Sequence, residues 1–207
     1  MKNLVLFASG SGSNAEKIIE HFKGSDQVQI THIYCNNPTA GIIQRAERLG
    51  VPCRVFDRES YKNGTVLKEV QSLRTDWIIL AGFLWLIPAD FVKAFPQRIV
   101  NIHPALLPKF GGKGMYGHFV HEAVVAAGEK ESGITIHYVN EHYDEGATIF
   151  QSSFPVLPSD TPEDVAKKGQ VLEHRDFPRV IESRVLPASS EYTIKNNCAH
   201  PMITRYF

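Results

Sequence analysis

Apolar residues along the chain follow two patterns: short runs, and stretches in which they recur every three or four positions. The first pattern predicts β-strands and the second predicts amphipathic helices. The predicted strands cover residues 3–8, 28–35, 51–56, 77–81, 98–102, 133–139 and 148–156, and the predicted helices cover residues 15–22, 42–49, 65–73, 118–127 and 162–183. This alternation indicates an α/β fold with a mostly parallel sheet, and the last two strands are expected as an antiparallel pair at its C-terminal side.

We expect one such domain over residues 1–185, with a twisted sheet covered by helices on both faces. The run WIILA at residues 77–81 has no polar position, which is typical of a strand buried on both faces. Residues 186–207 show little periodicity and predict a tail that packs on the domain or extends from it.

The charge and the lengths of the apolar runs limit the classes of function that we expect. Lys+Arg and Asp+Glu both number 22 in the 207 residues, so the formal net charge is zero and neither nucleic acid nor a membrane is an expected partner. No apolar run approaches the ~18 residues of a membrane span, and the apolar segment at residues 3–8 is too short for a secretion signal. We therefore expect a cytoplasmic protein. Its cysteines, Cys35, Cys53 and Cys198, form no C-x-x-C pair and are expected to be plain thiols.

The sequence SGSGSN at residues 9–14 separates the first predicted strand from the first helix. Glycines let the backbone approach an anion and a helix N-terminus offers free N–H groups, so the segment predicts a loop that holds one phosphate. A tight turn without a ligand is the alternative. The segment from Gly10 to Ala15 also fits the dinucleotide pattern G-x-G-x-x-A, but the second strand ends at Cys35 without the acid that a ribose needs. No Gly-Lys-Ser/Thr follows, which excludes a Walker loop.

A second group of polar residues follows the strand at residues 98–102. Asn101 and His103 are two apart, so their side chains point to the same side of an extended segment, at the edge of the sheet where ligands bind in such folds. A structural histidine is the competing interpretation. Asp144 is by default a turn former, but if it lies near His103 it would raise the pKa of the imidazole. The three residues would then suit proton transfer at a carbonyl-type centre.

Metal binding fits the sequence poorly. The nine histidines include no H-x-x-x-H pair on a helix, and His118 and His121, three residues apart, have no further ligands that can be named. We expect no metal.

Six motifs occur in a fixed order along residues 3–183. They are GSGSN at residues 10–14, AGF at 81–83, NIHPALLP at 101–108, His137, DEG at 144–146 and the pair Glu173-His174. Together they resemble the phosphoribosylglycinamide formyltransferases, folate-dependent enzymes of purine synthesis. The resemblance implies a single Rossmann-like α/β domain of the formyltransferase type, and it leaves open whether the protein is a monomer or a homodimer.

The resemblance also implies two substrate sites. Gly12, Ser13 and Asn14 would hold the phosphate of glycinamide ribonucleotide, and Pro104 and Glu173 would bind the same substrate. The folate pterin would lie between Arg58, Leu84, Trp85, Leu86 and Ile87 on one side and Asn140, Glu141, His142, Tyr143 and Asp144 on the other.

The implied catalytic residues are Asn101, His103 and Asp144, with Asn101 also touching the folate. The substrate amine would attack the formyl carbon of 10-formyltetrahydrofolate, the co-substrate, while Asn101 and a protonated His103 stabilise the formyl oxygen. Asp144 would keep His103 cationic. The chain departs from the common pattern at Leu84-Trp85, where many members have Met and a basic residue, and in the glycine-rich residues 110–117, where Lys113 is a candidate for anion binding.

Three other functions remain open. A formyltetrahydrofolate hydrolase would not need the phosphate loop, and the catalytic half of a methionyl-tRNA formyltransferase carries a further domain for which this chain is too short. A non-catalytic nucleotide-binding module would bind a phosphorylated ligand without turnover.

Overall fold

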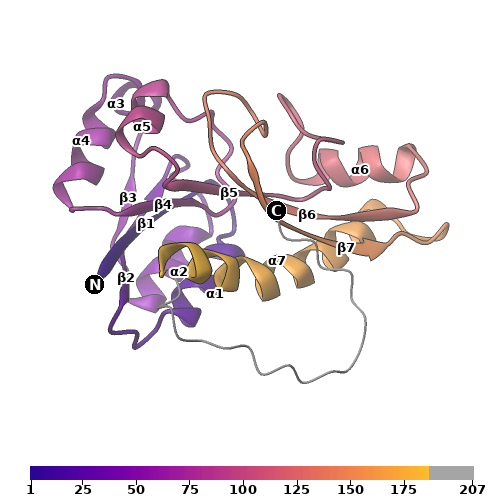
Figure 1. The fold of residues 1–207 in the computed structure, drawn as a ribbon, viewed down its shortest axis with the longest axis horizontal. Helices are drawn as coiled ribbons and strands as arrows, with labels where there is room; N and C mark the ends of the chain where they lie inside the picture. The colour runs from indigo at the N-terminus through magenta and orange to yellow at the C-terminus, as the bar shows by residue number, and fades with distance from the viewer. Residues whose placement is uncertain (187–207) are drawn as a thin grey trace.

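The computed structural model describes residues 1–186 as a seven-stranded sheet flanked by helices (Figure 1). The strands are β1 (Lys2–Ala8), β2 (Val28–Cys35), β3 (Cys53–Val55), β4 (Trp77–Leu80), β5 (Ile99–His103), β6 (Glu131–Tyr138) and β7 (Thr148–Pro155). The helices are α1 (Ser13–His21), α2 (Ile42–Leu49), α3 (Arg58–Lys62), α4 (Thr65–Ser72), α5 (Ala89–Ala94), α6 (His118–Ala126) and α7 (Pro162–Val185).

The strand order is β3-β2-β1-β4-β5-β6-β7. Strands β1 to β5 are all parallel, whereas β6 is antiparallel to both of its neighbours, β5 and β7. This confirms the predicted α/β domain with a mostly parallel sheet and an antiparallel pair at its C-terminal side. Since the parallel strands share a direction, their carboxyl ends meet at one edge, and the loops after β1, β4 and β5 gather there.

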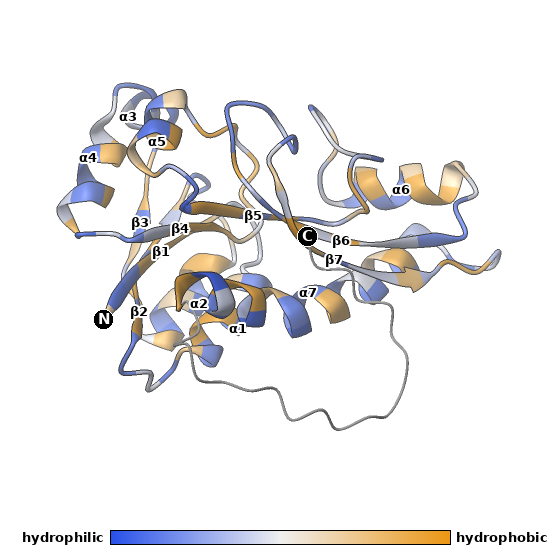
Figure 2. Ribbon diagram, viewed as in Figure 1, coloured by the Kyte–Doolittle hydropathy of each residue, from blue (hydrophilic) through white to orange (hydrophobic). Residues whose placement is uncertain are grey.

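Both faces of the sheet are buried. Along β1, Leu4 and Leu6 belong to the apolar core shared with α1, α2 and α7, while Val5 and Phe7 belong to the core shared with α4 and α5. Figure 1 shows these two groups of helices on opposite sides of the sheet. In Figure 2 the inner strands are mostly orange, whereas the helices carry blue segments. A strand covered on both faces needs apolar residues at every position, which is why the short apolar runs predicted the strands.

The long helix α7 begins with a capping box. The Thr161 side chain accepts from the Asp164 N–H, the Asp164 carboxylate accepts from the Thr161 N–H, and Pro162 occupies the first turn. The predicted helix over residues 162–183 is therefore confirmed. Helix α6 also follows its prediction, within one residue.

Two helices were not predicted. Helix α3 has five residues and starts at the cap Asp57, whose carboxylate accepts from the Ser60 N–H, and α5 has six residues. Neither is long enough to show a helical period. The predicted strand over residues 51–56 shortens to the three residues of β3.

Of the predicted thiols, Cys35 and Cys53 are free, and burial raises the pKa of Cys53 to about 11. Cys198 and the predicted tail, apart from Leu186, lie outside the described residues. Within residues 1–186, no helix has both the length and the apolar character that crossing a bilayer requires.

Candidate active site

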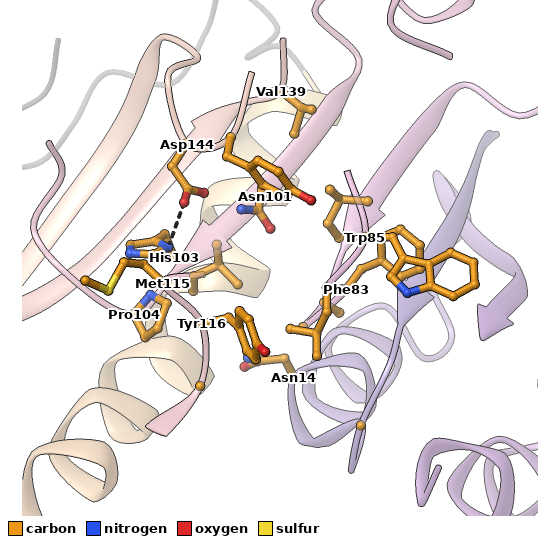
Figure 3. Close-up of a pocket in the computed structure, with 18 of the residues that line it drawn as sticks. Asn14, Phe83, Trp85, Asn101, His103, Pro104, Met115, Tyr116, Val139 and Asp144 are labelled. Carbon is orange, nitrogen blue, oxygen red and sulfur yellow. Dashed lines mark ion pairs between the residues drawn. The ribbon is translucent and has the colours of Figure 1, made fainter. Parts of the chain in front are cut away.

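A cavity of about 560 Å³ opens at the carboxyl ends of β1, β4 and β5 (Figure 3). Its walls come from segments that are far apart in the sequence. The lining residues lie within 10–14, 80–87, 101–104, 112–117 and 142–144, together with His121, His137, Val139 and Glu173. The phosphate loop and the Asn101–His103 segment, predicted separately, therefore face one cavity.

The loop at residues 10–14 has the geometry that anion binding needs. Gly12 has φ +79° and precedes α1, and a Cβ placed there would lie 2.3 Å from Ile42 Cδ1, so only glycine fits. Within the described part of the chain, the backbone N–H groups of residues 10–15 donate to no protein acceptor. Free N–H groups on a loop at a helix N-terminus are the donors that proteins offer to phosphate.

Helix α7 reaches back to this loop. Asn14 Nδ2 donates to Glu173 Oε2 over 2.7 Å, and burial raises the pKa of the Glu173 carboxyl above its ordinary value. Asn14 Oδ1 is buried and has no hydrogen-bond partner among residues 1–186. A buried acceptor without a donor is unfavourable, so this oxygen is available to a ligand hydroxyl.

His103, at the end of β5, is held by two segments. Its Nδ1 lies 3.4 Å from Asp144 Oδ2, as the dashed line in Figure 3 shows, and its Nε2 lies 2.7 Å from the carbonyl oxygen of Phe110. The backbone N–H of Gly112 donates to Asp144 Oδ2 over 3.0 Å. The glycine-rich loop at residues 110–117 therefore contacts both members of the His103–Asp144 pair.

The turn between β6 and β7 brings Asp144 to this place. Gly146 packs so tightly that a Cβ there would lie 1.6 Å from the carbonyl oxygen of Tyr138. Asp144 itself has φ +56°, a conformation that Asp tolerates better than most residues. The turn is therefore folded back on the strand that it follows, and this folding carries the carboxylate over β5.

Asn101 is oriented by a histidine on the neighbouring strand. Its Nδ2 lies 3.1 Å from His137 Nε2, and His137 Nδ1 lies 2.8 Å from the Tyr138 carbonyl oxygen. A carbonyl only accepts, so Nδ1 carries a proton; in the neutral ring Nε2 accepts from the Asn101 amide, and in the cationic ring it faces Asp144 Oδ1, 3.6 Å away. One N–H of the Asn101 amide is thereby used, and the second has no acceptor in the described residues.

Burial decides the pKa of His103. The ring is 3% exposed, and burial lowers its pKa below the ordinary value, against the raising effects of Asp144 and the Phe110 carbonyl. The predicted proximity of Asp144 is confirmed, but the prediction that it keeps the imidazole cationic is wrong, because removing the cation from water outweighs the nearby charge.

Asp144 shows the opposite balance. Burial acts to raise the pKa of its carboxyl, but the neighbouring His137 and His103 rings and the Gly112 N–H together hold it below the ordinary value. The pair therefore consists of an ionised carboxylate beside a largely neutral imidazole near pH 7.

The other wall is apolar and aromatic. Leu84, Trp85, Leu86 and Ile87 all line the cavity, and Phe83 packs beneath them at 6.4 Å from the Trp85 ring. Leu84 and Leu86 are 46% and 40% exposed, although both are large apolar residues. Together with Trp85 and Ile87 they give this wall an apolar surface suited to an apolar part of a ligand.

The structure does not bring every predicted residue to the cavity. Arg58 lies outside it, with its guanidinium carbon 4.7 Å from the centre of the Trp85 ring, and it lines a neighbouring groove instead. Asn140 and Glu141 also lie outside, and Asn140 Oδ1 accepts from the His142 N–H. Gly12, Ser13, Asn14, Pro104, Glu173, His142, Tyr143 and Lys113 all line the cavity.

Sequence reasoning missed several lining residues. Met115, Tyr116, His121 and Val139 were not predicted as site residues, and Phe83 and His137 were noted only as motif residues without a role. His121 could have been found from its position in α6, because it lies on the same buried face of the helix as Val120 and Val124. Among residues 1–186, no three His, Cys, Asp or Glu side chains are arranged to hold a metal ion.

Comparison with known proteins identifies relatives along most of the chain. Residues 2–181 match the family model described as formyl transferase. The phosphoribosylglycinamide formyltransferase of Bacillus subtilis is 36% identical over 88% of this chain and 94% of its own length. The chloroplastic enzyme of that name from Arabidopsis thaliana is 41% identical over 87% of this chain, which spans 64% of the plant protein.

Solved structures show the same fold. The phosphoribosylglycinamide formyltransferase of Bacillus halodurans superposes with a TM-score of 0.83 at 32% identity, covering 92% of this chain and 99% of that one. The match of the family model over most of the chain, supported by these relatives, shows that the chain belongs to the formyl transferase family.

Proposed function

We propose that this protein transfers the formyl group of 10-formyltetrahydrofolate to the amine of glycinamide ribonucleotide. The observation that carries the proposal is the combination, in one cavity, of the free N–H groups of residues 10–15 with Asn101, His103 and Asp144. A hydrolase of the folate alone would need only the second group. Relatives of the same family are named for this reaction.

In this proposal the ribonucleotide phosphate lies on the loop at residues 10–14. The N–H groups there and the positive end of the α1 dipole favour a dianion. The ribose then lies beside Asn14 and Glu173, where the unpaired Asn14 Oδ1 accepts from a ribose hydroxyl. This places the glycinamide amine toward Pro104 and His103.

The folate lies against the apolar wall from Leu84 to Ile87, with its formyl group toward Asn101. Attack by the amine lone pair forms the new carbon–nitrogen bond and moves the carbonyl electrons onto the formyl oxygen. The second N–H of Asn101 donates to that oxygen, and one such donor typically contributes ~2.7–4 kcal/mol to the transition state. Collapse of the intermediate then breaks the bond to N10 and restores the carbonyl.

A proton leaves the attacking amine, and N10 requires one. His103 Nε2–H is held by the Phe110 carbonyl, so the free lone pair is at Nδ1, beside the Asp144 carboxylate. The proton of the attacking amine reaches Nδ1 directly or through one water. The Asp144 carboxylate stabilises the resulting imidazolium, which then gives the proton to N10. The lowered pKa of His103 suits this role, because a ring that starts neutral is able to accept.

Purified protein incubated with both substrates tests the proposal. We expect formyl transfer that depends on the ribonucleotide. Cleavage of the folate without ribonucleotide would identify a hydrolase, and binding of the ribonucleotide without any reaction would identify a non-catalytic module. Cytoplasmic location and the choice between monomer and homodimer remain predictions from the sequence.

A further inference from the structure

Three consecutive carbonyl oxygens of the loop at residues 10–14 accept hydrogen bonds from residues that do not line the cavity. Gly10 O accepts from the Ile42 N–H over 3.1 Å, and Gly12 O accepts from the Glu16 N–H over 2.9 Å. Between them, Ser11 O accepts from Arg45 Nε over 2.8 Å. Three consecutive carbonyls thus have donors, while the N–H groups of the same loop have no acceptor in the described residues.

The donor to Ser11 differs from the other two because it is a side chain. Arg45 lies on α2, and its Nη1 also contacts the carboxylate of Glu16 on α1. The Glu16 side chain is 12% exposed, so it holds the guanidinium in a fixed place between the two helices. Arg45 does not line the cavity.

Arg48 provides an internal comparison. It lies one turn further along α2 and contacts the other oxygen of the same Glu16 carboxylate. Its side chain is 59% exposed, and it has no hydrogen bond to the loop within residues 1–186. The two arginines therefore share one partner, and only Arg45 touches the segment that would hold the phosphate.

We propose that Arg45 is a positioning residue of the phosphate subsite, which turns the Ser11 carbonyl away from the cavity so that the neighbouring N–H groups face the ligand. The inference rests on the proposed function. A peptide group that rotated the Ser11 oxygen toward the cavity would place a negative dipole end against the phosphate. Arg45 and Arg48 share the single Glu16 carboxylate, so a positive charge remains near the loop, and the substitutions below separate its effect from that of the hydrogen bond.

Two substitutions isolate this hydrogen bond. Gln has its Nε2 at the same place along the side chain as Arg Nε, whereas Met has a methyl group there. Arg45→Met should raise the KM for glycinamide ribonucleotide, and the inhibition constant of inorganic phosphate, at least ~10-fold, which is the usual effect of losing a charge-assisted hydrogen bond. Arg45→Gln should stay within about threefold of the wild type on both measures.

The remaining kinetic constants distinguish a role in positioning the phosphate loop from a general loss of active structure. In Arg45→Met the kcat and the KM for the folate should stay within about twofold, because the reacting atoms are untouched. Arg48→Met should leave the ribonucleotide KM within about twofold. If Arg48→Met raises it as much as Arg45→Met, or if Arg45→Gln behaves like Arg45→Met, the inference is wrong.

A second background covers misfolding. Arg45→Met leaves Glu16 with Arg48 as its remaining partner. If this variant loses its thermal unfolding transition, Glu16→Gln and the double variant Glu16→Gln/Arg45→Met replace the wild type and the single variant. Only the double variant should bind phosphate weakly, and equal binding by both would overturn the inference. If the wild type shows no formyl transfer the proposed function fails, whereas calorimetric titration with inorganic phosphate still decides the role of Arg45.

Discussion

His103 Nδ1 lies 3.4 Å from Asp144 Oδ2, although the two residues come from the end of a central strand and from the turn between the last two strands. The opposite nitrogen of the same ring lies 2.7 Å from the Phe110 carbonyl oxygen. An imidazole between two acceptors satisfies both only when both nitrogens carry protons, yet burial favours the neutral ring. The two demands oppose each other, which leaves Nδ1 ready to accept a proton.

Replacing His103 with Ala should lower kcat by at least ~10², because the proton acceptor beside Asp144 is lost. Ribonucleotide binding should change little, since the phosphate loop belongs to another part of the cavity. Single-turnover kinetics and a ribonucleotide titration measure the two effects. His118→Ala, at a histidine outside the cavity lining, is the control. A loss confined to KM would contradict the assigned role.

A carboxylate at position 13 should weaken ribonucleotide binding. In Ser13→Asp the new charge faces the phosphate, and we expect the Kd to rise at least ~10-fold, with the Kd for folate unchanged. Ser13→Ala is the matched control and should bind nearly as the wild type does. Asn14→Asp should act in the same direction, but it also sets two acids against each other at the contact with Glu173. Equal affinity of Ser13→Asp and Ser13→Ala would remove the phosphate from this loop.

Gly12 and Gly24 allow backbone strain to be separated from a clash. Both have φ near +80°, but a Cβ at Gly12 meets Ile42 Cδ1 at 2.3 Å, whereas a Cβ at Gly24 meets nothing within 4 Å. Gly24→Ala should cost about 1–2 kcal/mol of unfolding free energy. Gly12→Ala should cost about 1–3 kcal/mol more, because the core around Ile42 must shift. Urea unfolding of both variants measures the difference, and equal costs would contradict the close contact.

Stability should fall as the pH decreases from about 7 toward 5. Burial lowers the pKa of His103, His121 and His174 in the folded protein. The unfolded chain therefore binds more protons below the ordinary histidine pKa of ~6.5, and protonation favours unfolding. Asp144 acts in the same direction in a more acidic range: its lowered pKa stabilises the fold above the ordinary Asp pKa, and that contribution is lost as the pH falls below it. Urea titrations at several pH values measure the slope, which should be smaller in His121→Asn. A slope of zero would contradict the buried neutral histidines.

Trp85 should matter more for folate binding than Arg58. Trp85 lines the cavity, so Trp85→Ala should raise the KM for the folate ~10-fold through lost apolar contact. Arg58 acts only through its position over the indole ring, and Arg58→Met should raise the same KM by about fivefold or less. The reverse order would show that Arg58 contacts the folate directly.

The fold was largely predictable because buried strands and amphipathic helices have distinct periods. Helices α3 and α5 were missed because five or six residues are too few for a period, and their ends depend on caps such as Asp57. The site was predictable where local sequence sets the geometry, as in the loop at residues 10–14 and at Asn101 and His103 on β5.

Other features of the site depend on contacts that sequence alone does not give. The lowered pKa of His103 results from burial by several elements, and the contact of its Nε2 with Phe110 depends on the path of the glycine-rich loop. Arg45 carried no motif, and its contact with Ser11 appears only once α2 lies behind the loop.

The bond from Asn14 to Glu173 has a consequence for synthesis of the protein. By Pro155 the ribosome has made every strand of the described sheet, and the nascent chain already contains His103 and Asp144. Glu173, which accepts the hydrogen bond from Asn14, is not yet translated at that point, since it lies halfway along α7. A chain that ends after β7 would therefore contain every strand but neither Glu173 nor the helix that covers one face of the sheet, and we expect such a fragment not to bind the ribonucleotide.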